Sequence, residues 1–250
     1  MSCITYRSRV VEGCGLHDFV ARLPERFALE GDLVRKERNV LKTMDVDGRK
    51  VVVKQFRRPN IVQRLSYSTF RKGKAYRAYD NALQLKARGF DTPEPLACVE
   101  QRRLGIYQRS WYVYAYDDGT PLDTYDGFDQ RLIEAFAHLV VRLHESGVLY
   151  HDLNRGNFLC HFDEGEVVRF SMIDTNRARF PRRISLNQCI ADFLVLPVRE
   201  YGFEYFARCY LEERGWLDEA LLDEIMRRKF HRDGRRHPFK HLKNKKTVSI

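Results

Sequence analysis

The stretch Leu143-His144-Glu145-Ser146-Gly147-Val148-Leu149-Tyr150-His151-Asp152-Leu153-Asn154-Arg155-Gly156-Asn157-Phe158-Leu159 decides the fold. An amphipathic helix is expected to end soon after Leu143-His144, because a glycine such as Gly147 commonly follows a helix C-terminus. An Asp then stands at 152 and an Asn five positions later, and an apolar strand follows. The stretch therefore predicts a loop that carries two polar side chains, Asp152 and Asn157, between a helix and a strand.

A third polar side chain, Asp174, follows the apolar run 170–173, which is expected to be the next strand. Phosphoryl transfer requires such a set of side chains. One carboxylate accepts the proton of the attacking hydroxyl or orients it, while an amide and a second carboxylate hold Mg²⁺ on the phosphates. Asp152 is the candidate for the first role, and Asn157 and Asp174 are the candidate metal ligands.

The two halves of the sequence have different patterns. The first half is rich in strand patterns and has one clear helix, at 74–88. Its expected strands are 32–36, 40–46, 51–56, 96–100 and 109–116. The second half has mainly helical patterns, at 128–146, 190–196, 204–214 and 217–229. The sequence thus predicts an α+β fold: a small β-rich N-terminal lobe over residues 1–118, a mainly helical C-terminal lobe over 119–250, and a hinge near 116–121.

The Asp152–Asn157 loop and the following Ile173-Asp174 resemble the catalytic loop and metal-binding Asp of the protein-kinase-like superfamily. The resemblance implies a bilobal fold that uses ATP and Mg²⁺. It also implies that Lys54, which ends Val51-Val52-Val53-Lys54, contacts the nucleotide phosphates, although a surface lysine is the alternative. Asp80 stands where the superfamily helix usually offers a Glu to that lysine. Asp is one methylene shorter, so an ordinary solvated Asp80 is the alternative.

The sequence departs from conventional protein kinases in several places. The first hairpin, 36–39, has no glycine, so Arg38 or Asn39 is expected to meet phosphate with its side chain. Tyr150-His151 stands where protein kinases usually have His-Arg. After Asp174 there is no Ala-Pro-Glu element and little room for an activation segment, and Asn154 stands where a Lys is usual. These differences favour a small-molecule or glycan acceptor over a protein acceptor.

Within the superfamily, the chain is most similar to the lipopolysaccharide core kinases that phosphorylate Kdo or heptose, in particular to Bacteroidetes-type members of that family. The stretches that carry the similarity are 53–60, 70–75, 89–95, 143–159 and 173–180. The resemblance implies an ATP-dependent sugar kinase whose acceptor is a Kdo hydroxyl of a lipid A precursor. Arg155, Arg177 and Arg179 are candidates for binding acceptor carboxylate or phosphate, because a guanidinium offers a planar fork. Surface solubility is the alternative for these three.

The net charge of +10 is concentrated in two basic segments. Residues 57–77 contain seven Lys and Arg residues and no acidic one, and residues 227–246 contain ten against a single Asp233. Such segments attract polyanions, including anionic lipid; a solubilising, partly disordered tail is the alternative. With no signal-peptide-like run and no membrane span, the expected location is cytoplasmic, peripheral at the inner face of the cytoplasmic membrane. No specific nucleic acid and no protein partner are expected.

Two other functions stay open. One is a small atypical protein kinase or ATPase that acts near RNA. The other is a catalytically weak, kinase-like module that binds polyanions, which the glycine-free hairpin and Asp80 favour. Intact Lys54, Asp152, Asn157 and Asp174 argue against the module.

Overall fold

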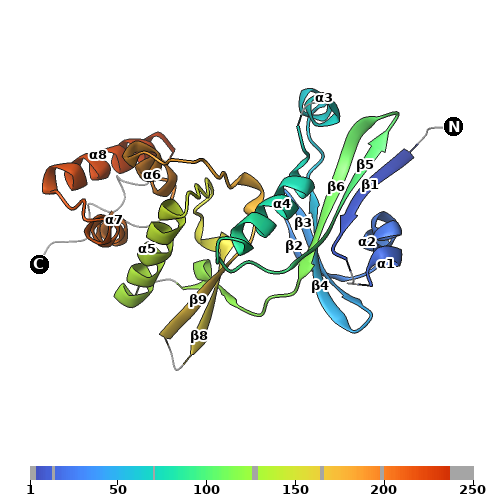
Figure 1. Cartoon of the computed structure of the whole chain (residues 1–250), viewed down its shortest axis with the longest axis horizontal. Helices are drawn as coiled ribbons and strands as arrows, with labels where there is room; N and C mark the ends of the chain where they lie inside the picture. The colour runs from blue at the N-terminus through green and yellow to red at the C-terminus, as the bar shows by residue number, and fades with distance from the viewer. Residues whose placement is uncertain are drawn as a thin grey trace, which may run out of the picture. The chain divides into compact units, whose positions relative to one another are not determined.

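The computed structural model in Figure 1 describes residues 4–12, 15–69, 71–125, 129–163, 166–197 and 200–236. Its internal contacts divide the chain into two compact units. The first unit consists of Met1–Leu122 and Asn157–Ala178, and the second consists of Asp123–Gly156 and Arg179–Ile250.

The first unit is built on a six-stranded antiparallel sheet with the strand order β1-β5-β6-β4-β3-β2. The strands are β1 (Ile4–Val10), β2 (Asp32–Lys36), β3 (Val40–Val46), β4 (Arg49–Phe56), β5 (Pro95–Arg103) and β6 (Ile106–Ala115). Successive side chains of a strand point to opposite faces of its sheet. The run of three valines and a lysine in β4, residues 51–54, therefore contributes to both faces, and its side chains are buried on both.

Helices of the first unit bury the two faces of this sheet. Phe19 and Phe27 of the short helices α1 (His17–Ala21) and α2 (Leu23–Leu29) share one core with Val51 and Val53. Ala75, Ala78 and Tyr79 of α4 (Lys74–Lys86) share the other with Val52 and Phe56. Lys54 is two residues from both Val52 and Phe56, so its side chain points to the same face of the sheet as theirs, the face that α4 covers.

Two elements of the first unit differ from the sequence expectation. Residues 4–10, which are not among the expected strands, form the edge strand β1, which pairs with β5 through its backbone while most of its side chains stay exposed. Residues 57–73, which were expected to form a basic linker before the helix at 74–88, contain the helix α3 (Ile61–Thr69), in which Tyr67 is the buried side chain. Neither segment buries a regular apolar stripe, so hydrophobic periodicity gives little signal there.

A second, three-stranded sheet carries the metal-ligand candidates. It consists of β7 (Thr120–Pro121), β8 (Phe158–Asp163) and β9 (Glu166–Met172), with short 3₁₀ turns η1 (Leu122–Thr124), η2 (Arg155–Asn157) and η3 (Thr175–Arg177) beside it. Thr92 Oγ1 donates to the Met172 carbonyl at 2.6 Å, and the Met172 N–H donates to the Asp91 carbonyl at 2.9 Å. These contacts explain why the β8–β9 hairpin groups with the first unit. The division into lobes at residue 118 stays a prediction.

The second unit is helical. It contains α5 (Gln130–Glu145), α6 (Leu186–Phe193), α7 (Glu200–Glu213) and α8 (Glu219–Arg236). Its core holds a cluster of aromatic rings: Phe136, Phe193, Phe203, Phe206 and Tyr210. α6 begins earlier than the expected 190, because Ser185 and Gln188 form a capping box.

The basic tail is described only in part. Residues 227–236 lie in α8, and residues 237–246 lie outside the described residues. In the ranges that the structure describes, no helix has the length and apolar character needed to cross a bilayer.

Candidate active site

The centre of the site in the first unit is an ion pair between Lys54 and Asp174. Lys54 Nζ lies 2.7 Å from Asp174 Oδ2, and the lysine side chain is only 8% exposed. Burying a charge is costly unless a partner compensates it, so a lysine in the middle of β4 requires this carboxylate. Two charged groups far apart in the sequence are therefore brought together where the sequence predicted a phosphate-binding lysine and a metal ligand.

Asn157 and Asp174 lie at the same end of the β8–β9 hairpin. The Ile173 N–H donates to the Asn157 carbonyl at 2.9 Å, which places Asn157 opposite the residue before Asp174. Asp174 then adopts the left-handed conformation, with φ of 63°, which Asp tolerates better than most residues. Carboxylate and amide oxygens are the hard ligands that Mg²⁺ prefers. The two residues thus have the chemistry of Mg²⁺ ligands, and their backbones lie at one end of the same hairpin.

α4 fixes the turn that follows Asp174. Asn81 Nδ2 donates to the carbonyls of Thr175 at 2.8 Å and Ala178 at 3.1 Å. Thr175 Oγ1 donates in return to the Ala78 carbonyl at 2.8 Å. Sequence reasoning assigned no role to Asn81, because an Asn in a helix gives no sign of a distant backbone partner.

The expected pairing of Asp80 with Lys54 is wrong. Asp80 Oδ1 lies 2.8 Å from Arg9 Nη1, and its Oδ2 lies 2.5 Å from Lys72 Nζ. Lys54 instead pairs with Asp174. The physical reason is the direction of Asp80, which faces β1 and the segment before α4, whereas Ala78 of the same helix lines the cavity beside Lys54.

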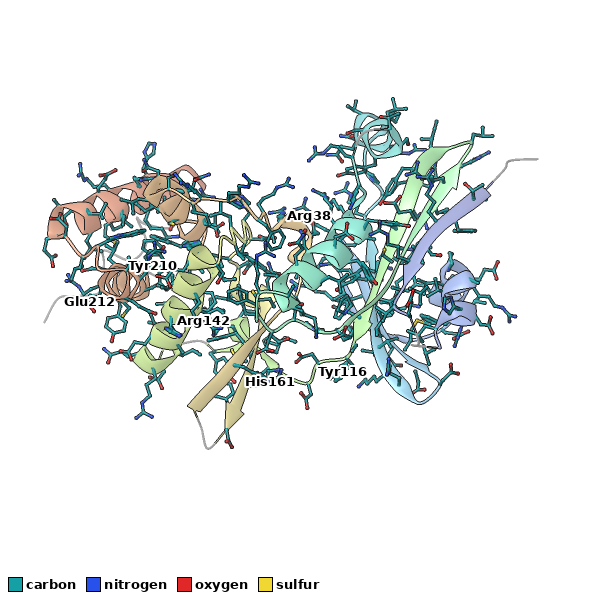
Figure 2. The ribbon with its side chains drawn as sticks, in the orientation of Figure 1. Arg38, Tyr116, Arg142, His161, Tyr210 and Glu212 are labelled. Carbon is teal, nitrogen blue, oxygen red and sulfur yellow. The ribbon has the colours of Figure 1, made fainter. Side chains whose placement is uncertain are left out.

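Further cations lie near Asp174. Burial lowers the pKa of the Lys74 amine, and the nearby guanidinium groups of Arg38 and Arg77 lower it further, while Asp174 opposes them. Figure 2 shows Arg38 on the turn between β2 and β3, beside α4. Such a set of like charges is stabilised by an anionic ligand. Lys74 was missed by sequence reasoning because it stands in a run of other basic residues.

The other hairpin candidate, Asn39, is engaged by the protein itself. Its Oδ1 accepts the Arg57 backbone N–H at 3.1 Å. Of the two residues that were expected to bind phosphate, Arg38 lies near the cation Lys74, whereas Asn39 holds the backbone just after β4.

The loop that carries Asp152 belongs to the second unit and is held by the buried Asp192. The Tyr150 N–H donates to Asp192 Oδ2 at 2.9 Å, and the His151 N–H donates to Oδ1 at 2.6 Å. His151 has a φ of 59°, an unfavourable value that these bonds maintain. The half-buried Asp152 follows directly, and its carbonyl accepts the Asn154 N–H at 2.6 Å. Asp192 therefore fixes the backbone next to the candidate catalytic residue.

A buried histidine extends this network. His144 Nε2 lies 3.2 Å from Asp192 Oδ2, and its Nδ1 lies 2.8 Å from the Tyr210 hydroxyl. Burial by itself lowers the pKa of His144, but hydrogen bonds with Asp192 and Cys189 outweigh it, and the net pKa is raised. Sequence reasoning gave neither His144 nor Asp192 a role, since only the fold brings them together from α5 and α6.

The three candidate acceptor-binding arginines do not lie in one unit. Arg177 is exposed in the first unit, on η3. Arg155 and Arg179 lie in the second, where Arg155 donates to the Tyr125 carbonyl. The backbone of Arg179 pairs with that of Leu149 at 2.8 and 3.0 Å and leaves its side chain exposed. Their role in acceptor binding stays a prediction.

Comparison with solved structures shows what the fold is similar to. The structure entitled "WaaP in complex with acyl carrier protein" matches with a TM-score of 0.60 and 21% identity, over 90% of this chain and 98% of that one. The Rio2 kinase–ADP/Mg²⁺–phosphoaspartate complex from Chaetomium thermophilum matches with a TM-score of 0.49 and 14% identity, over 90% of this chain and 80% of that one. The first match confirms the predicted kinase-like fold. A comparison with curated proteins found no match.

The sequence itself matches the profile of the "Lipopolysaccharide kinase (Kdo/WaaP) family" over residues 25–188. That range covers well over half of the 250 residues and includes Lys54, Asp152, Asn157 and Asp174. The resemblance drawn from the motifs is confirmed. The chain therefore belongs to the lipopolysaccharide kinase (Kdo/WaaP) family, whose members are kinases that phosphorylate sugars of the lipopolysaccharide core.

Proposed function

We propose that this kinase transfers the terminal phosphate of ATP to a hydroxyl of Kdo in the lipopolysaccharide inner core or its lipid A precursor. The observation that carries the proposal is the buried Lys54–Asp174 ion pair, with Asn157 at the same end of the β8–β9 hairpin. A lysine, a carboxylate and an amide are the groups that bind a nucleotide triphosphate with its metal.

Each residue of the first unit has a distinct role in this proposal. Lys54 binds the α- and β-phosphates, and Asn157 and Asp174 hold Mg²⁺, which supplies neutralisation of phosphate charge when bound. Lys74 and Arg38 add positive charge beside Asp174 and favour the polyphosphate chain over a neutral ligand. Asp80 has no part in nucleotide binding.

Asp152 acts on the acceptor. Its carboxylate accepts a hydrogen bond from the sugar hydroxyl, orients that oxygen toward the γ-phosphorus, and takes the proton as the new P–O bond forms. The bond from the γ-phosphorus to the β–γ bridging oxygen breaks in the same step, and ADP leaves. Asp192 keeps the backbone at Tyr150 and His151 in place, so that the carboxylate does not have to be ordered during the reaction.

Kdo is favoured over heptose because of charge. Kdo carries a carboxylate, whereas heptose is neutral, and a guanidinium binds a carboxylate through two parallel hydrogen bonds. Arg155, Arg177 and Arg179 are the proposed donors. The acceptor is an anionic glycolipid, so the enzyme is proposed to act at the inner face of the cytoplasmic membrane.

The Asp152→Asn substitution tests the mechanism on acyl-free Kdo and heptose acceptors. We expect turnover of the Kdo acceptor to fall about 10²–10⁴-fold, the usual value of positioned base catalysis, with Mg²⁺–ATP affinity unchanged. Retention of more than about a tenth of wild-type turnover would contradict the role. Faster turnover of the heptose acceptor by the wild-type enzyme would contradict the choice of Kdo.

The expectation of no protein partner needs its own test, because WaaP was solved with an acyl carrier protein. Co-purification of a tagged full-length chain with an added acyl carrier protein measures this directly. A stable complex would overturn the expectation without affecting the proposed chemistry.

A further inference from the structure

α3 presents large apolar side chains to solvent. Ile61, Val62 and Leu65 are 70%, 76% and 50% exposed. At 3.6 residues per turn the three lie within about 100° of the helix circumference, so they form one continuous face. The opposite side of α3 is packed, with the buried ring of Tyr67 against that of Tyr107 at a centroid distance of 5.3 Å. The outward face therefore contributes nothing to the core of the first unit.

The β5–β6 hairpin holds α3 in this position. Arg64 Nε donates to the Tyr107 carbonyl at 2.9 Å, and the Tyr107 N–H donates to Ser68 Oγ at 2.9 Å. Arg102 donates to the carbonyls of Tyr67 and Ser68, both at 3.2 Å. Figure 1 shows α3 beside the end of this hairpin, clear of the rest of the sheet. The apolar face is thus presented by a fixed helix.

The adjoining hairpin turn exposes another large apolar residue, in an unfavourable conformation. Leu104 is 71% exposed and has a φ of 51°, a region that disfavours a branched side chain and is better suited to Asn or Gly. Gly105 follows with a φ of 76°. An exposed leucine there adds no packing to the first unit, so folding alone gives no reason for it.

Exposed cations flank these apolar side chains along the sequence. They are Arg57, Arg58, Arg71, Lys72, Arg103 and Arg109, and residues 57–77 contain no acidic side chain. Exposed apolar residues with nearby Lys and Arg residues are typical of a surface that inserts into the interface of an anionic bilayer.

We propose that α3 and the Leu104 turn form a membrane-docking surface. Val62, Leu65 and Leu104 enter the boundary between headgroups and acyl chains, while Arg71 and Arg103 contact headgroup phosphates. The proposal rests on the proposed function only in its choice of a membrane, since a glycolipid acceptor is reached at a bilayer. It assigns docking to the first unit, apart from the basic tail.

The decisive experiment measures binding of the full-length protein to phosphatidylcholine vesicles with and without phosphatidylglycerol. Val62→Ser/Leu65→Ser is expected to weaken binding to anionic vesicles at least about tenfold, because each inserted side chain loses its transfer from water. The matched control is Leu29→Ser, which removes a side chain that is 86% exposed on α2. The control is expected to bind as the wild type does.

Leu104→Asn separates docking from folding. Asn accepts a positive φ more readily than Leu, so the melting temperature is expected to stay the same or rise, while vesicle affinity falls about threefold or more. Arg71→Gln/Arg103→Gln is expected to weaken binding to anionic vesicles, and Arg22→Gln/Arg49→Gln, which removes two exposed cations elsewhere in the first unit, is not.

Three results would overturn the proposal: wild-type affinity in Val62→Ser/Leu65→Ser, an equal loss in Leu29→Ser, or no vesicle binding by the wild type. If only the arginine variants bind vesicles more weakly, the surface binds through charge alone and the proposed insertion of apolar side chains is wrong.

All variants are also assayed on an acyl-free Kdo acceptor, where wild-type rates are expected. Failure of that assay with the wild-type enzyme would count against the proposed function, and the vesicle data would still decide the docking surface.

Discussion

Asp174 pairs with Lys54 and is also the proposed ligand of the metal. The Asp174→Ala substitution removes a carboxylate oxygen from both, so we expect Mg²⁺-dependent nucleotide binding to be lost. It also leaves a buried ammonium at Lys54 without its counter-ion, which is expected to lower stability by about 3–5 kcal/mol. Titration of ADP with and without Mg²⁺ measures the first effect, and urea unfolding measures the second.

Asp80→Ala is the matched control. Asp80 pairs with Arg9 and Lys72, both exposed, so its loss is expected to cost no more than about 1 kcal/mol and to leave nucleotide binding unchanged. Unchanged metal dependence in Asp174→Ala, or lost nucleotide binding in Asp80→Ala, would reverse the assignment.

Gly73, the residue before α4, is constrained by its neighbours. A Cβ at this position would overlap Glu100 Oε1 and lie 2.7 Å from a ring carbon of Tyr107. Both neighbours are buried, and the Gly73 N–H donates to Glu100 Oε1 at 3.1 Å. Gly73→Ala is therefore expected to destabilise the protein by about 1–3 kcal/mol, the usual cost of overpacking.

Thermal unfolding of Gly73→Ala and Gly215→Ala checks this expectation. Gly215 has open space around its Cβ position but a φ of 63°, so its loss measures backbone strain alone. An unchanged melting temperature in Gly73→Ala would mean that Glu100 moves aside at no cost.

At the residue scale, the sequence suggests functional side chains where they follow a strict spacing. It gives no signal for side chains whose partners are set by the tertiary fold. The roles proposed for Asp152, Asn157 and Asp174 come from such a spacing, because the loop and the strand after it impose their order. Asp80 was misassigned because one of its partners, Arg9, lies on β1, a strand that had not been predicted. Asp192 stands forty residues after Asp152 and could not be connected to it by pattern.

At the scale of elements, Asp192 joins α6 to the end of α5 and to the catalytic loop. Asp192→Ala leaves two backbone N–H groups and His144 without their shared acceptor. We expect a loss of about 2–4 kcal/mol in stability and at least a tenfold fall in turnover, with the Michaelis constant for ATP little changed. Asp192→Asn retains one oxygen acceptor and is expected to recover part of both. Equal turnover in the two variants would mean that Asp192 serves the fold alone.

The same network predicts a pH dependence. Because the folded-state pKa of His144 is raised, its protonated form contributes stability that is fully present below about pH 6.5, the unfolded value, and is lost as pH rises through the folded pKa. Wild-type stability is therefore expected to fall from pH 6 to pH 8 more than that of Asp192→Ala. Cys189 interacts with His144 as well, so the comparison is repeated with Cys189→Ser.

Elements were predictable where they bury one regular stripe. The sequence located β3, β4, α4 and α5 within about two residues, because their apolar side chains follow the helical or strand period. β1 and α3 were missed, because one is an edge strand with exposed side chains and the other carries its apolar residues outward. The missed helix is the one proposed to dock to the membrane, where the usual relation between apolar pattern and burial is reversed.

At the scale of the whole molecule, the charge of +10 is set largely by the tail. Residues 235–250 carry six Lys and Arg residues and no acidic one, so a chain that ends at residue 234 has a net charge of +4, ten minus six. Each cation near an anionic leaflet contributes about 1 kcal/mol, so the tail is expected to strengthen membrane attachment. The shorter chain should bind anionic vesicles at least about tenfold more weakly, because even partial engagement of the six exceeds the 1.4 kcal/mol of one decade.

The salt dependence distinguishes the tail from the apolar surface on α3. Exposed charges are screened as the Debye length shortens to about 3 Å at ~1 M salt, whereas insertion of apolar side chains is not. Full-length protein should therefore lose affinity steeply as salt is added. The shorter chain should show a flatter salt dependence, with residual binding that disappears in Val62→Ser/Leu65→Ser.

Both chains should phosphorylate the acyl-free Kdo acceptor at similar rates, since the tail has no part in the proposed chemistry. Equal vesicle binding by the two chains would show that the tail is not an anchor. If the full-length chain does not bind vesicles but binds RNA, and the shorter chain does not bind RNA, an atypical kinase that acts near RNA becomes the better account of this protein.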